Sequence, residues 1–237
     1  MIQMNPQPKL TIGIMDRRAE THGSLNGPFL GNGFGPLSGR FSAREDSGSI
    51  AFFIEGRQEG FRLPWIRLDP VNDSTFRLLQ VTIGNRFHWE KQKDLTYRGS
   101  MILKPRPDGT LAVLNEIPLE DYLVSVISSE MNPEAPVEFL RVHAILSRSW
   151  VLAALSRHQA AGTSSPPARP PGGSPGKPIV RWYDREDHDG YDVCADDHCQ
   201  RYQGIPDIPR QAGEAVHDTR GRVITLDGKV CDGRYSK

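Results

Sequence analysis

The chain has 237 residues, of which 37% are hydrophobic and 24% are charged. This length and apolar content are enough to form the core of one large or two small globular domains. Its 29 basic residues balance its 29 acidic residues. That balance argues against electrostatic binding to nucleic acid or to an anionic membrane surface, so we expect no nucleic-acid partner. A weakly charged polymer such as a glycan fits this composition better.

The sequence contains no stretch of about 18 apolar residues, so no transmembrane segment is predicted. Residues 1–10 also lack the basic start and the apolar core of a signal peptide. The protein is therefore expected to be either cytoplasmic or made with an export segment that this sequence does not contain.

Residues 1–96 carry short β-branched and aromatic runs separated by turn residues, which predicts a β-rich region. The expected strands are Lys9–Ile14, Ser49–Ile54, Leu78–Ile83 and Arg86–Glu90. Gly31–Gly35 resembles a dinucleotide-binding loop, but the third glycine of that fingerprint falls on Pro36, so we interpret the segment as a turn. The next two runs, Tyr97–Leu103 and Leu111–Leu114, flank a Pro-Asp-Gly turn and predict a hairpin.

Two helices are predicted after this hairpin. The first starts near Pro118, carries an apolar stripe at helical spacing and ends before Pro133. The second runs from Pro136 to about His158. The stripes consist of Leu119, Tyr122, Leu123 and Val126 in the first helix and of Leu140, Ala144, Ser147 and Val151 in the second.

Residues 161–178 are rich in Pro, Gly and Ser and are expected to form a linker without a function of its own. Residues 179–237 are more aromatic and acidic, and they contain short strand-like pieces such as Arg222–Leu226. The last residues do not resemble a domain ending, so we expect the chain to be truncated. The predicted fold is α+β: a β-rich part, a central two-helix segment at 97–160 and a mixed C-terminal β part, arranged as two lobes around a cleft.

Four potential metal ligands lie within twelve residues: His188, Cys194, His198 and Cys199. Imidazole and thiolate are the preferred ligands of tetrahedral zinc, so the cluster predicts a structural Zn²⁺ site. The neighbours His198 and Cys199 would point to opposite faces of a regular strand, so both can bind one ion only if the backbone turns there. A disulfide between Cys194 and Cys199 is the alternative.

Three further stretches resemble the SpoIID/LytB family of sporulation and cell-wall proteins. Asn115–Met131 is similar to the family's "N...L..YL.GV...EM" segment, and Phe139–Trp150 is similar to its "ALKAQAVAARTY" helix. Tyr191–Gly204 looks like the segment "D.....Q.Y.G", and Thr219–Ile224 fits the strand that follows it. The matches occur in family order.

The chain departs from the family pattern at several positions. Val142 and His143 replace the usual Ala-Gln, and a serine, Ser125, replaces a common glycine. Ser149 and Trp150 stand where Thr-Tyr is usual, and these changes look like packing changes. The Gly-rich segment that follows the position of Tyr235–Lys237 in the family is absent, which suggests that a wall of the cleft is missing.

The resemblance implies a peptidoglycan lytic transglycosylase that acts on glycan strands without stem peptides, in the cell envelope or periplasm. Glu130 matches the family's catalytic position, and one carboxyl group suffices because the nucleophile belongs to the substrate. Its place at a helix end after an apolar stripe favours a neutral carboxyl. The positions that the resemblance assigns to substrate binding are Arg148, Arg141, Gln200, Tyr202, Tyr235 and Lys237.

Two other functions remain open from the sequence. The first is a non-catalytic glycan-binding module that enhances a cell-wall amidase. The second is a zinc hydrolase in which Asp196 or Asp197 serves as the base, although the chain has no H-E-x-x-H motif.

Overall fold

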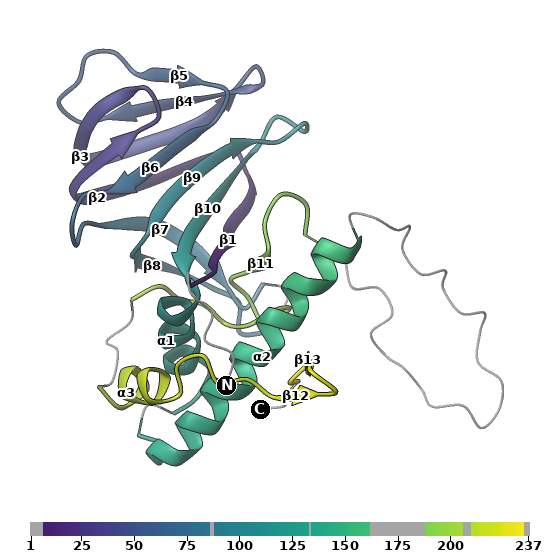
Figure 1. Cartoon of the computed structure of the whole chain (residues 1–237). Coiled ribbons are helices and arrows are strands. Elements are labelled where there is room, and N and C mark those ends of the chain that lie inside the picture. The colour runs from purple at the N-terminus through teal and green to yellow at the C-terminus, as the bar shows by residue number, and fades with distance from the viewer. Residues whose placement is uncertain (1–6, 86–87, 133, 162–187, 206–209, 235–237) are drawn as a thin grey trace.

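The structure is a computed structural model, and it describes residues 7–85, 88–132, 134–161, 188–205 and 210–234. A large, twisted sheet forms one end of the molecule, and three helices gather at the other end (Figure 1). This arrangement confirms the predicted α+β class with a β-rich N-terminal part. The expected linker at 161–178 lies outside the described residues, apart from its first position.

The main sheet is antiparallel except at one edge. Its strands follow the order β11-β1-β10-β9-β6-β2-β3-β4-β5, with β7 pairing with β2 and β8, and only the β1–β11 pair is parallel among the described strands. The bounds are β1 Lys9–Arg18, β2 Glu20–Gly31, β3 Phe34–Asp46, β4 Ser49–Ile54, β5 Phe61–Leu63, β6 Ile66–Pro70, β7 Thr75–Ile83, β8 Lys91–Tyr97, β9 Ser100–Pro105, β10 Leu111–Pro118 and β11 Val193–Cys194.

The sheet continues across the expected boundary between residues 96 and 97. Strand β8 pairs with β7, and β9 pairs with both β6 and β10, so strands from both expected regions belong to one sheet. The side chains that alternate toward the inner face form its core, including the fully buried Phe29, Phe52 and Tyr97. The sheet therefore provides a single rigid support for the segments that follow.

Most of the predicted strands are confirmed, as is the turn at Gly31–Gly35, which connects β2 to β3. The strand predicted at Arg86–Glu90 is wrong where the structure describes it, because residues 88–90 form a turn between β7 and β8. Gly84 adopts a φ of +69°, and a Cβ there would lie 2.3 Å from the Trp89 ring. The chain reverses direction at this point, and the indole ring of Trp89 packs against Gly84.

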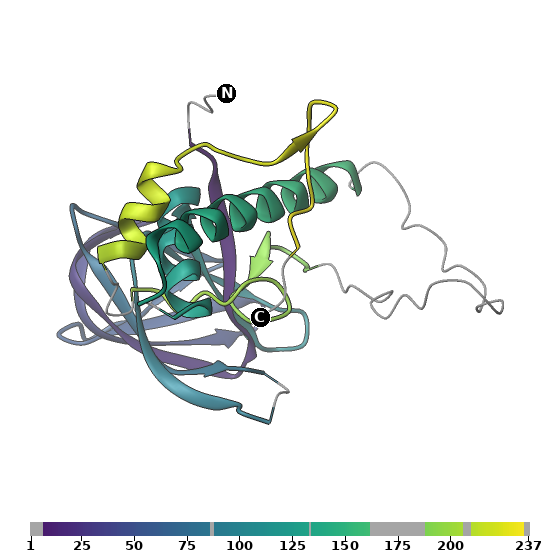
Figure 2. The ribbon, with the colours of Figure 1, turned by 90° about the horizontal axis from the view of Figure 1, so that it is seen from below.

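Both predicted helices are confirmed: α1 spans Leu119–Glu130 and α2 spans Val137–Ala161. Every residue of the two predicted stripes is buried. Seen from below, α2 crosses the molecule as one long rod, with α1 and α3 beside its first half (Figure 2). None of the described helices has both the length and the apolar character that a membrane span requires.

The C-terminal part is not purely β. A third helix, α3 (Arg210–Asp218), buries Ala212, Ala215 and Val216 and was not predicted. It is short and mostly polar, so its apolar face has few residues to reveal a helical period. The expected strand at Arg222–Leu226 is reduced to β12 (Thr225–Leu226), which pairs with β13 (Lys229–Val230).

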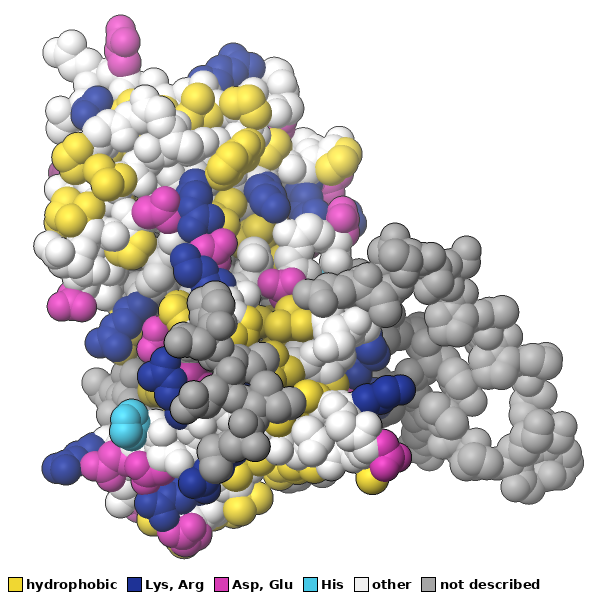
Figure 3. Space-filling model, in the orientation of Figure 1, with side chains coloured by type: hydrophobic (Ala, Val, Ile, Leu, Met, Phe, Trp, Pro, Cys, Tyr) yellow, Lys and Arg dark blue, Asp and Glu magenta, His cyan; other side chains and the backbone are white. Residues whose placement is uncertain are grey.

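The visible surface mixes charges of both signs, as the zero net charge implies (Figure 3). Hydrophobic side chains are also exposed over the sheet end of the molecule. The large exposed hydrophobic residues of the strands and their connections include Leu30, Phe53 and Trp65.

Candidate functional site

Glu130 is the last residue of α1, and its side chain is only 3% exposed. One carboxylate oxygen, Oε1, accepts a hydrogen bond from the backbone N–H of Arg201 at 2.9 Å. The other, Oε2, lies 3.5 Å from Nε2 of His143, whose side chain is also 3% exposed. The carboxyl group therefore sits between α1, α2 and the loop that contains Arg201, in the shielded environment that its sequence position predicts.

The Arg201 side chain covers the same helix end. Its guanidinium pairs with Asp197 at 2.9 Å and donates a long hydrogen bond of 3.5 Å to the carbonyl oxygen of Ser129. The guanidinium carbon also lies 4.7 Å from the centroid of the Trp89 ring, within the range of a cation–π contact. Arg201 thus links the end of α1 to the turn after β7.

His143 is a neighbour of Glu130 that the sequence interpretation missed, because it was taken as a packing change. Its ring centroid lies 6.4 Å from that of Phe139, one helical turn earlier, and the Phe139 side chain is exposed. One sequence signal could have revealed it: His143 is a titratable residue next to the buried stripe of α2, at Leu140 and Ala144. A polar group in such a position requires a partner.

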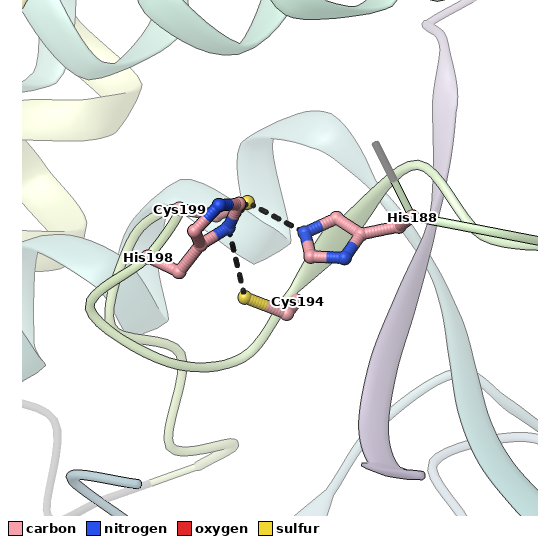
Figure 4. A group of neighbouring side chains, drawn as sticks. All are labelled: His188, Cys194, His198 and Cys199. Carbon is pink, nitrogen blue, oxygen red and sulfur yellow. Dashed lines mark hydrogen bonds between the residues drawn. The ribbon is translucent and has the colours of Figure 1, made fainter. Parts of the chain in front are cut away.

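The four predicted metal ligands converge on one point (Figure 4). Their ligand atoms all lie within 4.8 Å of one another. Nε2 of His188 is 3.1 Å from Sγ of Cys199, and Nδ1 of His198 is 3.9 Å from Sγ of Cys194. Ligands of one tetrahedral zinc ion lie about 3.3 to 3.8 Å apart, given bond lengths of about 2.0 to 2.3 Å. Two imidazoles and two thiols in this arrangement could bind a metal ion.

The backbone turns between the third and the fourth ligand, as a shared ion requires. The N–H of Cys199 donates to the carbonyl oxygen of Asp196 at 3.0 Å, which closes a turn through His198. All three cysteines of the chain lie in the described part and are free thiols, so the structure contains no Cys194–Cys199 disulfide. A hydrogen bond with the Cys199 thiol, together with burial, raises the pKa of the Cys194 thiol to about 11. Binding of a metal ion would instead require the thiolate.

The loop at 188–205 is docked firmly onto the sheet. Strand β11 pairs with β1, and the side chain of Asp192 accepts a hydrogen bond from the N–H of Thr11 at 2.7 Å. A Cβ at Gly13 would lie 2.6 Å from the Tyr191 ring, so this close approach requires glycine. The carboxylate of Asp196 accepts bonds from two N–H groups at the end of β7. The metal-ligand cluster and Arg201 therefore belong to one anchored loop.

Gln200 and Tyr202 were expected to bind substrate, but both are 1% exposed in this structure. The Tyr202 hydroxyl donates to Oδ1 of Asn115 at 2.6 Å, and the Tyr122 hydroxyl donates to Oε1 of Gln200 at 3.1 Å. Asn115 in turn donates to two backbone carbonyls of the sheet. These side chains fasten the loop to β10 and α1, and such buried groups cannot contact a sugar where they lie.

Arg148 is also buried, with an exposed fraction of 0%. Its guanidinium forms a two-point contact with the carboxylate of Glu120, at 3.0 and 2.6 Å, and donates to backbone carbonyls of α2, α3 and the segment after α3. Glu120 lies in the first turn of α1, about 15 Å along the helix from Glu130 at 1.5 Å per residue. In this structure Arg148 therefore joins α1, α2 and α3, and its expected role in substrate binding stays a prediction.

Among the remaining expected substrate residues, Arg141 is the one that the structure describes. Arg141 is part-exposed and pairs with Glu138 and Asp218, which links α2 to α3. These carboxylates raise the pKa of Arg141, chiefly through the hydrogen bond that its guanidinium donates to Asp218. Tyr235 and Lys237 lie outside the described residues.

A cavity of about 50 Å³ lies on another side of α1, beside Asp121, Arg98 and Tyr202. Burial raises the pKa of the Asp121 carboxyl, against the lowering effect of Arg98 and Arg220. A cavity of this volume holds a few water molecules and is too small for a sugar ring. This small cavity is not evidence for the cleft that was expected between two lobes.

Two comparisons with known proteins bear on the site. Residues 107–226, about half of the chain, match the family described as "SpoIID: Stage II sporulation protein". A stretch of 58 residues is also 36% identical to an uncharacterised protein of Brachyspira hyodysenteriae. This stretch is 24% of the chain and 16% of that relative, so the match spans about a sixth of the relative's length. The family match covers Glu130, His143 and the metal-ligand cluster.

Proposed function

This chain belongs to the SpoIID family, and we propose that it is a peptidoglycan lytic transglycosylase with Glu130 as its catalytic acid and base. SpoIID members are cell-wall-related sporulation proteins, so we also assign the chain to the cell envelope or periplasm. The observation that carries the proposal is the Glu130 carboxyl, 3% exposed at the end of α1 and within the segment that matches the family.

The reaction needs one carboxyl group. Glu130 gives its proton to the glycosidic oxygen between N-acetylmuramic acid and N-acetylglucosamine while the bond from C1 to that oxygen breaks. The C6 hydroxyl of the muramoyl residue attacks C1, and its proton passes to the Glu130 carboxylate. A 1,6-anhydro end forms, the carboxyl group is neutral again, and no water is consumed. A second carboxylate to activate water or to form a covalent intermediate is not required.

The surroundings of Glu130 suit both halves of this reaction. Shielding from water favours the neutral acid before the sugar bond breaks. The backbone N–H of Arg201 at Oε1 stabilises the carboxylate that forms when the proton has left. A side chain with 3% exposure cannot touch a glycosidic oxygen without local movement, so glycan binding must displace some of the groups that cover it.

We assign the surface that binds the glycan strand to the start of α2. Phe139 and Val142 are 48% and 57% exposed, and Phe139 lies one helical turn before His143. Aromatic faces stack on pyranose rings, so Phe139 is the group that we expect the glycan to contact. Phe139→Ala should raise KM for glycan strands and leave the unfolding midpoint unchanged, measured by product release and by urea titration. An unchanged KM would remove Phe139 from the site.

We further propose that His188, Cys194, His198 and Cys199 hold a structural zinc ion. Four protein ligands close a tetrahedral shell and leave no open position for a reacting water, so the ion would stabilise the loop and not take part in the reaction. The loop continues directly into Arg201, whose N–H holds Glu130.

Zinc content tests this assignment. Protein purified without a histidine tag should contain about one zinc ion per chain, and Cys194→Ser should lower this ratio strongly because it removes one ligand. Cys231→Ser is the matched control, since Cys231 is a part-exposed thiol outside the cluster, and it should keep its zinc. A ratio near zero in the unaltered protein, or equal ratios in the two variants, would exclude the site.

Substrate choice tests the enzymatic proposal. Incubation with denuded glycan strands should release soluble fragments that end in 1,6-anhydro-N-acetylmuramic acid, and strands that keep their stem peptides should resist cleavage. Mass spectrometry of the soluble fraction identifies these ends. If the protein binds denuded strands and releases nothing from them, it is a binding module and not an enzyme.

A further inference from the structure

We propose that the Arg201 guanidinium binds the lactyl carboxylate of N-acetylmuramic acid and so selects glycan strands that have lost their stem peptides. The inference rests on the proposed function, because it concerns how the same site chooses its substrate. It assigns the preference for denuded strands to one basic side chain of the loop at 188–205.

Arg201 lies where this loop meets the end of α1. Its backbone N–H donates to Oε1 of Glu130 at 2.9 Å, and Nη1 of its side chain donates to the carbonyl oxygen of Ser129 at 3.5 Å. The Arg201 side chain is 25% exposed, whereas that of Glu130 is 3% exposed. A positive charge that solvent can reach therefore lies beside the last turn of the helix that carries the proposed acid.

Two contacts orient the guanidinium before any ligand arrives. Nη2 donates to both carboxylate oxygens of Asp197, at 2.9 and 3.2 Å. The guanidinium carbon lies 4.7 Å from the centroid of the Trp89 ring, in the turn between β7 and β8. An arginine that is held by a carboxylate and an aromatic ring loses less conformational freedom on binding an anion than an unrestrained arginine does.

The guanidinium keeps donors for a second anion. Arginine has five N–H donors, and the contact with Asp197 involves Nη2 alone. Nη1 makes one long hydrogen bond, and Nε is buried without a hydrogen-bond partner among the described residues. A buried donor without a partner costs free energy, so a ligand acceptor that reaches this group is favoured. Asp197 thus orients the guanidinium and leaves part of its donor capacity unused.

Removal of the stem peptide creates the anion that such a group recognises. The peptide is joined by an amide bond to the lactyl group on C3 of N-acetylmuramic acid, and cleavage of that bond leaves a carboxylate. A strand that keeps its peptide has a neutral amide at the same place. The lactyl group belongs to the ring whose C1 is attacked in the proposed reaction, so it is bound near Glu130. Arginine binds a carboxylate through two parallel charge-assisted hydrogen bonds, which a neutral amide cannot form.

A pair of matched substrates tests the proposal. Denuded strands are compared with the same strands after their lactyl carboxylates have been coupled to methylamine, which removes the charge and keeps the sugars intact. For the unaltered protein, KM should be about ten- to a hundredfold higher for the methylamide strands, as expected for the loss of a hydrogen bond to a charged group. For Arg201→Gln, KM should be equally high for both kinds of strand.

Arg210→Gln is the matched control, because Arg210 is 90% exposed on α3 and pairs with Glu214. It should prefer the denuded strands as strongly as the unaltered protein does. Equal KM values for the two kinds of strand in the unaltered protein would overturn the proposal. So would an Arg201→Gln protein that keeps the full preference for the free carboxylate.

A second measurement needs neither turnover nor a change at Arg201. The Nε–H signal of Arg201 is followed by NMR in Glu130→Gln while a short denuded strand fragment, or its methylamide, is added. The signal should shift with the carboxylate fragment and stay in place with the methylamide. Equal shifts with both fragments would contradict carboxylate recognition. Failure of the proposed function looks different: the unaltered protein cleaves neither strand, although the Arg201 signal still distinguishes the two fragments.

Discussion

Glu130→Gln is expected to reduce the release of anhydro ends by a factor of about a hundred to ten thousand, the usual contribution of a positioned acid/base group. The amide has almost the shape of the carboxyl group, and its oxygen can still accept the hydrogen bond from the N–H of Arg201. It cannot give a proton to the leaving oxygen or take one from the C6 hydroxyl. The loss should therefore appear in kcat, with KM for denuded strands little changed.

The fold should survive this substitution. The amide fills the same volume as the carboxyl group, and its oxygen can accept the hydrogen bond that the Arg201 N–H donates to Oε1 of Glu130. We expect Glu130→Gln to unfold in urea as cooperatively as the unaltered protein does. Glu138→Gln is the matched control on the next helix, where the side chain is 76% exposed, and it should keep full activity. Equal activity in the two variants would remove Glu130 from the reaction.

Arg148→Met is expected to lower the free energy of unfolding by about 3 to 5 kcal/mol, the typical cost of removing one partner from a buried ion pair. The guanidinium is 0% exposed and is the common partner of Glu120 and of carbonyl groups on α2, α3 and the following segment. Methionine fills most of the space but leaves the Glu120 carboxylate without its partner in a poorly solvated place. Urea unfolding followed by circular dichroism measures the loss.

A double substitution separates the ion pair from simple packing. Arg148→Met combined with Glu120→Gln removes both charges and should recover part of the stability lost in the single variant. Arg210→Met is the exposed control, since its pair with Glu214 is on the surface of α3, and it should cost less than about 1 kcal/mol. A loss below about 1 kcal/mol for Arg148→Met would mean that the pair does not hold the helices together.

Sequence patterns predicted the features that depend on residues close together in the chain. The helical period and the flanking prolines indicated α1 and α2 to within a few residues, and the buried stripes follow directly from that period. The metal-ligand cluster was also recognisable, because its members are close in sequence and chemically distinctive. The shielded position of Glu130 followed from its place at a helix end.

Features that depend on contacts between distant segments could not be predicted. His143 and Arg201 meet Glu130 only because α2 and the loop at 188–205 fold against the same end of α1. A periodic pattern predicts which face of α2 is buried but not which partner each buried residue meets. Arg148 shares the buried face of α2, and its partner is Glu120 at the far end of α1. The sequence pattern therefore could not show that Arg148 pairs with Glu120.

The same limit applies to Gln200 and Tyr202. Their amide and phenol groups are of the kind that line sugar sites, yet their hydrogen bonds go to Tyr122 and Asn115 in the interior. The residue type shows what an amide or a phenol can bind. The hydrogen-bond partner that it actually has is seen only in the folded structure. The missed turn after β7 has the same origin, since it depends on the contact between Gly84 and Trp89.

The central claim is that the substrate's own hydroxyl, and not water, closes the reaction at Glu130. Cleavage of denuded strands in water enriched in oxygen-18, followed by mass spectrometry of the new ends, tests it most directly. Our account predicts anhydro ends that carry no heavy oxygen. New reducing ends that carry oxygen-18 would mean that water attacks C1, and the chain would then be a hydrolase.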